Sequence, residues 1–168
     1  HKIIYDKNLL EVDLSYWSGL TINEIKNKYP EDYLIWKNDP ENLKLIRDDN
    51  YRYQPIQELY DQAEVFIKNI FKVYLGKDDA NVLIVGHNAI LRCLILLLIG
   101  KPKKGFRKIK LDNASFSIIN ISQKKGSFST QVECLNQTSH LNKNIPDQIG
   151  DSRIILVRHG ETNWNKEG

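Results

Sequence analysis

The stretch that decides the fold is Arg153-Ile-Ile-Leu-Val-Arg-His-Gly-Glu-Thr-Asn-Trp-Asn-Lys-Glu-Gly168. Its apolar residues 154–157 have the length and composition of a short buried parallel strand. Arg158, His159 and Gly160 follow directly. In open α/β sheets the ligand crevice lies beyond the carboxyl ends of the strands, so we expect these residues to face a ligand.

A second stretch, Ile84-Val85-Gly86-His87, repeats this arrangement, because an apolar run again ends in a histidine. The two imidazoles would face one crevice if their strands are neighbours in the sheet. Helices and strands are expected to alternate, which favours an α/β fold with a mainly parallel sheet flanked by helices. The helices are expected at residues 21–37, 55–76 and 88–99, the strands at 82–85, 115–121, 128–135 and 154–157, and a loop or mobile cap at 38–53.

These residue types suit phosphoryl transfer. A neutral imidazole attacks phosphorus, and a guanidinium such as that of Arg158 holds two phosphoryl oxygens at once. A second, protonated histidine donates to the phosphoryl group in the transition state. Gly160 lets the backbone approach the phosphate closely. His87 taken alone is more often structural, whereas the run from Arg158 to Thr162 is typical of a catalytic signature.

The motif Arg158-His159-Gly160-Glu161 resembles the signature of the histidine phosphatase (phosphoglycerate mutase-like) superfamily. The resemblance extends to Trp164-Asn165, where a phosphate-contacting asparagine is expected, and to Gly86-His87-Asn88, which is similar to the family's second histidine motif. Leu9-Leu10-Glu11-Val12-Asp13-Leu14 resembles the segment that carries the general acid glutamate. The resemblance implies a phosphoglycerate mutase-like fold, incomplete or permuted.

Two departures accompany the resemblance. Ser15 stands where the family usually has glycine, and residues 55–59 replace a Gly-Glu-Ser found in many members. With residues 136–140, the second departure looks most like the cyanobacterial and plastid branch that includes carboxyarabinitol-phosphate phosphatases. The family's second phosphate-clamping arginine has no counterpart in context. The substitutes by residue type are Arg47, Arg52, Arg92 and Arg107.

The resemblance implies a phosphomonoester hydrolase that acts on a small sugar phosphate or phospho-acid through a phosphohistidine. His159 is the nucleophile, Arg158, Gly160 and Asn165 bind phosphate, His87 stabilises the transition state, and Glu11 protonates the leaving oxygen. A partly buried carboxyl group can hold the proton that this step needs. No metal and no cofactor is required. Two alternatives stay open: phosphoglycerate mutase-type transfer, and a degenerate unit with a binding or dimerisation role.

The order of the motifs is unusual, because His159 follows His87 by 72 positions whereas the family has its nucleophile first. The chain either is circularly permuted or straddles two tandem units, and we favour the second reading. Residues 1–141 then form the later part of one unit, residues 142–152 a linker, and residues 153–168 the opening strand and nucleophile motif of the next. Residues 153–168 can instead dock onto residues 1–141, since a missing central strand leaves unpaired edges. We expect this piece alone to have weak or no activity.

The composition fits a globular protein rather than a disordered one, with 168 residues of which 41% are hydrophobic and 27% charged. A net charge of +3 gives no argument for nucleic acid, and the longest apolar run, residues 93–99, is too short to cross a membrane. Two cysteines without metal-ligand spacing favour reduced thiols in the cytoplasm. We therefore expect a small phosphorylated metabolite as partner, with a homodimer left open.

Overall fold

The computed structural model describes residues 3–77, 80–100, 105–124, 127–143, 145 and 151–156. The chain forms two units, residues 1–137 and residues 138–168, and each is described by itself. In the first unit the α-helices are α1 (Ile22–Lys28), α2 (Pro30–Asn38), α3 (Pro55–Tyr74) and α4 (Asn88–Leu98). Its strands are β1 (Leu45–Ile46), β2 (Arg52–Tyr53), β3 (Phe116–Lys124) and β4 (Ser127–Gln137).

The helix expected at residues 21–37 is two helices. Thr21 caps α1 with the predicted capping box, in which its side chain accepts from the Glu24 N–H and its own N–H donates to the Glu24 carboxylate. Tyr29 separates the helices, and Pro30 is the first residue of α2. Proline is tolerated in the first turn of a helix but not in its interior, so the chain stops and restarts there.

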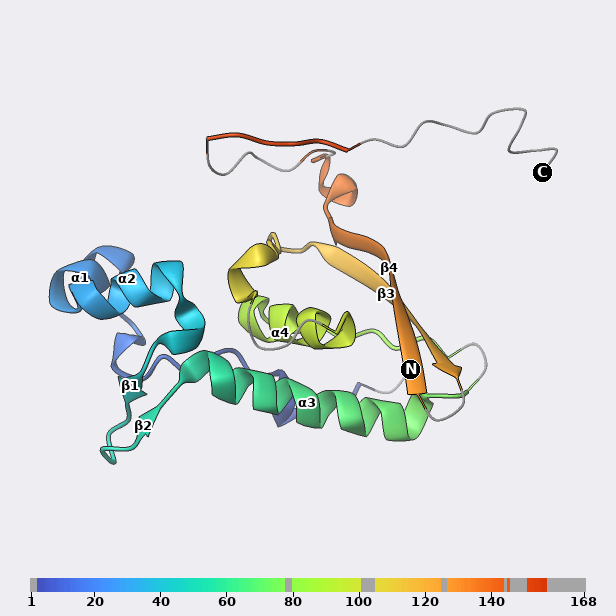
Figure 1. Ribbon diagram of the computed structural model, residues 1–168, viewed down its shortest axis with the longest axis horizontal. Helices are drawn as coiled ribbons and strands as arrows, with labels where there is room; N and C mark the ends of the chain where they lie inside the picture. The colour runs from blue at the N-terminus through green and yellow to red at the C-terminus, as the bar shows by residue number, and fades with distance from the viewer. Residues whose placement is uncertain are drawn as a thin grey trace. The chain divides into compact units, whose positions relative to one another are not determined.

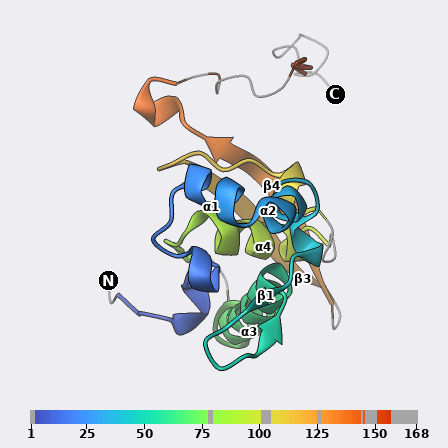
Figure 2. The same ribbon diagram turned by 90° about the vertical axis from the view of Figure 1, so that its left-hand side faces the viewer.

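Helices α3 and α4 form the main core, and they lie side by side in Figures 1 and 2. Pro55 opens α3 as predicted, and Gly76 follows the helix with a φ of +79°. The buried residues of α3 recur at helical spacing, which gives the helix one apolar face. In the main cluster these residues are Ile56, Leu59, Tyr60, Ala63 and Phe66, together with Ala89, Ile90, Cys93, Leu94, Ile95 and Leu96 of α4.

Residues 38–53, expected as a loop or mobile cap, are mostly loop but contain the 3-10 turn Pro40–Asn42 and the short strands β1 and β2. β1 and β2 pair antiparallel, and the hairpin precedes the N-terminal end of α3 (Figure 1). Leu43, Leu45 and Tyr53 are buried against Trp17 in a second hydrophobic cluster. Burial of these four side chains stabilises the segment, although each strand has only two residues.

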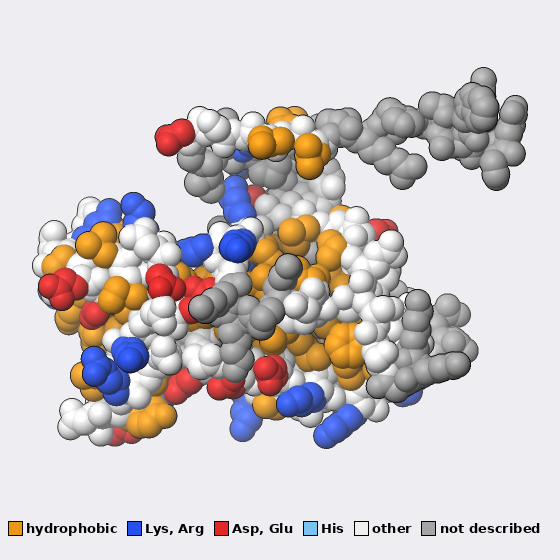
Figure 3. Space-filling model, in the orientation of Figure 1, with side chains coloured by type: hydrophobic (Ala, Val, Ile, Leu, Met, Phe, Trp, Pro, Cys, Tyr) orange, Lys and Arg blue, Asp and Glu red, His pale blue; other side chains and the backbone are white. Residues whose placement is uncertain are grey.

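The two strands expected at residues 115–121 and 128–135 are confirmed as the antiparallel pair β3–β4. The hairpin contacts both long helices. Phe71 of α3 packs against Phe128 at 4.8 Å between ring centroids, and the Thr130 hydroxyl donates to the Leu98 carbonyl of α4 at 2.7 Å. Figure 3 shows hydrophobic side chains gathered on the surface over α4 and this hairpin. Phe116, Ile118 and Val132 are among the exposed ones.

The buried strand predicted at residues 82–85 is not found, and this expectation is wrong. The segment makes no ladder within the described residues, and the side chains of Leu83 and Val85 are 89% and 79% exposed. Ile84 packs on the main core from the other side. The run is apolar on both faces, as a central strand is, but only one face is covered. Both sheets in the described part of the chain are two-stranded and antiparallel, so a mainly parallel sheet is not shown.

The second unit is described over residues 138–143, 145 and 151–156. It contains one 3-10 turn, Ser139–Leu141, closed by Asn142 with a φ of +59°. The Thr138 hydroxyl donates to the Lys143 carbonyl at 2.8 Å. Residues 151–156 are exposed and form no strand, so the strand predicted at residues 154–157 is not found over its described part.

Candidate functional site

His87 lies at the beginning of α4, where its backbone has the extended conformation of an N-cap residue. Its imidazole is exposed, whereas Ala89 and Ile90, the second and third residues after it, are buried. The side-chain amide of Asn88 donates to the Leu111 carbonyl at 2.8 Å. A fixed helix start therefore holds a solvent-accessible imidazole.

Glu11 reaches this helix start from a distant part of the sequence. Both of its carboxylate oxygens lie 3.1 Å from the Ala89 backbone nitrogen, 78 positions along the chain, and accept from this N–H. One oxygen also accepts from the Val12 N–H at 2.8 Å. The first N–H groups of a helix have no partner within the helix and attract negative charge. The structure thus brings two predicted site residues, Glu11 and His87, to the same end of α4.

The segment that carries Glu11 is attached on both sides. The Gln62 side chain of α3 donates to the Leu10 carbonyl at 2.9 Å, and the Tyr53 hydroxyl donates to the Asp13 carbonyl at 3.0 Å. Ser15 has a φ of +48°, and its hydroxyl donates to the Ile46 carbonyl at 2.7 Å. A positive φ favours glycine, which gives a physical reason for the family's usual residue at this position.

Arg47 is bonded to protein carboxylates, which removes it as a substitute for a phosphate-clamping arginine. Its Nε donates to Asp13 at 2.9 Å and its terminal nitrogens donate to Glu58 at 2.7 and 3.3 Å. The guanidinium also lies 3.9 Å from the centroid of the Tyr53 ring. The hydrogen bonds to Glu58 raise the pKa of Arg47 the most, against the opposing effect of burial. Sequence reasoning missed this network, because its members are 34 and 11 positions apart.

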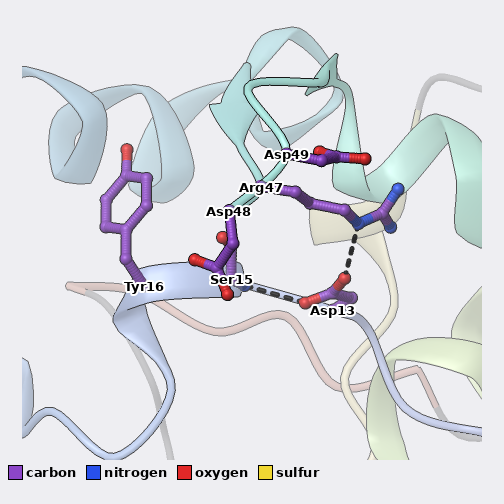
Figure 4. Close-up of a pocket in the computed structure, with 6 residues that line it drawn as sticks. All are labelled: Asp13, Ser15, Tyr16, Arg47, Asp48 and Asp49. Carbon is purple, nitrogen blue, oxygen red and sulfur yellow. Dashed lines mark hydrogen bonds and ion pairs between the residues drawn. The ribbon is translucent and has the colours of Figure 1, made fainter.

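The Asp13 carboxylate has a pKa below its ordinary value of 3.8. Partial burial acts to raise it, but hydrogen bonds from the Ser15 N–H and from Arg47 together outweigh burial. An open pocket of about 490 Å³ lies beside this carboxylate (Figure 4). Its lining is Asp13, Ser15, Tyr16, Arg47, Asp48 and Asp49. Three carboxylates against one guanidinium disfavour a phosphate there.

The other three arginines differ in their surroundings. Arg52 lies on the exposed side of β2. Arg107 donates to the Trp36 carbonyl at 2.6 Å and contacts the Phe106 ring. Arg92 lies 5.2 Å from the Phe106 ring centroid, and its buried Nε has no hydrogen-bond partner within the described residues. Burial and the nearby Arg107 lower the pKa of Arg92, whereas attraction by Glu11 acts to raise it. Arg92 thus lies near enough to Glu11 for the carboxylate to act on its pKa.

The other half of the predicted site lies outside the described residues. It comprises Arg158, His159, Gly160 and Asn165. The described residues contain no group of three or more His, Cys, Asp or Glu side chains that could hold a metal ion. No described helix combines the length and the apolar composition needed to cross a membrane.

The sequence profile of the histidine phosphatase superfamily (branch 1) matches residues 1–133. A 2-carboxy-D-arabinitol-1-phosphatase from Triticum aestivum is 30% identical over 171 residues, which cover 99% of this chain and 33% of that protein. Phosphoserine phosphatase 1 from Hydrogenobacter thermophilus is 25% identical over 140 residues, 83% of this chain and 61% of that protein. The chain therefore spans about a third of the wheat protein and less than two thirds of the bacterial one.

Among solved structures, the α-ribazole phosphatase from Shigella flexneri is similar with a TM-score of 0.61 and 25% identity. The similarity covers 79% of this chain and 59% of that one. A mycobacterial glucosyl-3-phosphoglycerate phosphatase, solved with inorganic phosphate, has a TM-score of 0.63 at 18% identity and shares the fold. This chain thus shares its fold with part of each of these longer chains.

Proposed function

Since the chain belongs to the histidine phosphatase superfamily (branch 1), we propose that the protein is a phosphomonoester hydrolase that works through a phosphohistidine. The observation that carries the proposal is the contact of Glu11 with the Ala89 N–H at the start of α4. This contact places Glu11, the predicted proton donor, at the start of α4, the helix whose N-cap residue is His87. Glu11 and Ala89 are 78 positions apart in the sequence.

In the proposed reaction the neutral imidazole of His159 attacks phosphorus and displaces the alkoxide of the ester. Arg158, Gly160 and Asn165 hold the phosphoryl oxygens, and protonated His87 stabilises their charge in the transition state. The leaving oxygen takes a proton from Glu11 and departs as an alcohol. Water then attacks the phosphohistidine, releases inorganic phosphate and restores the imidazole. The scheme requires neither a metal nor an organic cofactor.

If His87 and His159 serve one active site, residues 153–157 have to lie beside residues 82–85. Leu83 and Val85 are strongly exposed, and so are Ile154 and Leu156 at 86% and 90%. Pairing two such segments would satisfy backbone groups and bury apolar side chains from both. We propose this docking as the alternative to two separate units, in which residues 153–168 complete the site of residues 1–141 and His159 comes to lie near His87. The tandem reading, with residues 1–141, 142–152 and 153–168 as first unit, linker and second unit, remains our preferred organisation, and circular permutation is its alternative.

The proposed substrate is a small phosphorylated metabolite, either a sugar phosphate or a phospho-acid. The names of the wheat and Hydrogenobacter relatives both describe phosphatases of phosphorylated acids, which supports this class. A phosphoglycerate mutase would use the same intermediate but return the phosphoryl group to a hydroxyl. We propose a cytoplasmic location, supported by two free thiols, Cys93 and Cys134. We propose no nucleic-acid partner, and a homodimer is the remaining candidate for assembly.

The function is tested in the longest natural protein that contains this chain. Rapid quenching with a ³²P-labelled phosphate ester should give an acid-labile phosphoenzyme that water discharges. Discharge by 3-phosphoglycerate instead would establish the mutase. If the two histidines share one site, His87→Ala and His159→Ala should each lower turnover by at least about 100-fold. If they belong to two active units, each variant should keep the turnover of the other unit. His140→Ala, a substitution of an exposed histidine outside the proposed site, is the matched control. Full activity of the His87 variant would instead support a degenerate unit.

A further inference from the structure

The Glu11 segment is held by contacts that converge on one side chain. Asp13 is the second residue after Glu11, and it is tied through its carboxylate to Arg47 and through its carbonyl to Tyr53. Arg47 in turn bonds Glu58 in the first turn of α3. One guanidinium therefore connects the Glu11 segment, the β1–β2 hairpin and α3.

We propose that Arg47 is a positioning residue, which fixes the Glu11 carboxylate at the Ala89 N–H by clamping Asp13 to Glu58. The inference rests on the proposed function only in giving Glu11 a catalytic role. The geometry itself, from Arg47 through Asp13 to Glu11 and Ala89, stands without it.

The clamp has the features that make a partly exposed ion pair effective. Isolated surface pairs contribute little, because two long side chains lose freedom for a weak attraction. Here one planar guanidinium bonds two carboxylates, at 2.9 and 2.7 Å, and its face rests on the Tyr53 ring. Each contact restricts the same side chain, so one loss of freedom serves several interactions.

The distance along the chain is short enough to transmit this restraint. Only Val12 separates Glu11 from Asp13, and the Leu10 carbonyl is held by Gln62 on the other side. Glu11 thus lies between two attachment points. Without Arg47, the Asp13 carboxylate is released and Asp13 is held only through its carbonyl by Tyr53, so the Glu11 carboxylate is held less tightly at the Ala89 N–H.

The direct test is NMR spectroscopy of the Ala89 amide in Arg47→Gln and Arg47→Lys variants of this chain. We expect the amide proton of Arg47→Gln to move toward the position of an unbonded amide, with exchange faster by about tenfold. Arg47→Lys keeps the charge but cannot bond both carboxylates in the same way, so it should restore the signal only in part. Arg52→Gln makes the same charge change on the same hairpin and should leave the Ala89 amide unchanged.

A general loss of stability is distinguished by the amides of Cys93 in α4 and Ile119 in β3. Under the proposal they keep their wild-type exchange in Arg47→Gln while Ala89 changes. An unchanged Ala89 amide in a folded variant, or an equal effect of Arg52→Gln, overturns the proposal. If Arg47→Gln does not fold, Glu58→Gln, which removes one charge of the clamp, replaces it with the same expected response.

Activity of the longest natural protein supplies the second readout. Arg47→Gln should lower kcat by about tenfold to a hundredfold with KM within about twofold, because the proton donor is misplaced while phosphate binding persists. If the Ala89 amide signal changes in Arg47→Gln but kcat does not fall, the catalytic role of Glu11 is contradicted, whereas the proposed positioning of Glu11 by Arg47 stands. A loss of kcat without an Ala89 response contradicts the clamp.

Discussion

Replacing Glu11 by alanine should destabilise the fold as well as the proposed reaction. The carboxylate accepts from the Ala89 N–H with both oxygens at 3.1 Å, and its removal leaves a first-turn N–H of α4 without this acceptor. Loss of a capping side chain costs about 0.5–2 kcal/mol. Loss of negative charge at the positive end of a helix costs about 0.3–1 kcal/mol. Because Glu11 is only half-buried, we expect a total near 1–2 kcal/mol.

Urea denaturation followed by circular dichroism measures this loss, and the melting temperature should fall by about 3–6 °C. Glu11→Gln retains an oxygen acceptor and should cost less than half as much. Glu31→Ala removes an exposed carboxylate from the first turn of α2 and serves as the matched control. If Glu11→Ala unfolds at the wild-type urea concentration, the carboxylate does not cap α4. In the longest natural protein, Glu11→Gln should lower kcat by about 10²–10⁴-fold.

Three further predictions concern separate features of the chain. Aspartate at positions 83 and 85, in place of Leu83 and Val85, should cost more than about 1 kcal/mol of unfolding free energy if residues 153–157 dock there. It should cost less than about 0.5 kcal/mol if that surface stays bare. Tyr60→Phe removes a buried hydroxyl that has no hydrogen-bond partner in the described part of the chain, so its urea midpoint should equal or exceed that of the wild type. The lowered pKa of Asp13 means that its contribution to stability is present above pH 3.8 and is lost as the pH falls through the lower folded value. Asp13→Asn should therefore flatten the acid limb of a stability-against-pH curve.

The helices could be predicted because their signals are local. Thr21 and Glu24 lie three positions apart, and Pro55 and Gly76 mark the two ends of α3. The hairpin at residues 45–53 was missed because two-residue strands carry no periodicity, and what orders them is the burial of Leu45 and Tyr53 against distant residues.

Family motifs mark Glu11 and His87, and the structure brings both to one end of α4, whereas their roles in a site stay predictions. The clamp of Arg47 could not be predicted, since it depends on which carboxylates the fold places around one guanidinium. Residues 82–85 are a case in which the sequence predicts an element that the structure does not form. Their composition is that of a central strand, but a strand forms only when partners lie on its edges, and the described residues supply none.

The most direct test of the account is whether His87 and His159 share one anion. The chain has four histidines, so the imidazole C–H signals of His87, His140 and His159 can be followed separately by NMR during a titration with vanadate. If the two imidazoles share one anion site, the His87 and His159 signals move together with a single dissociation constant while the His140 signal stays in place. Movement of only one of the two, or two different constants, would contradict a shared site.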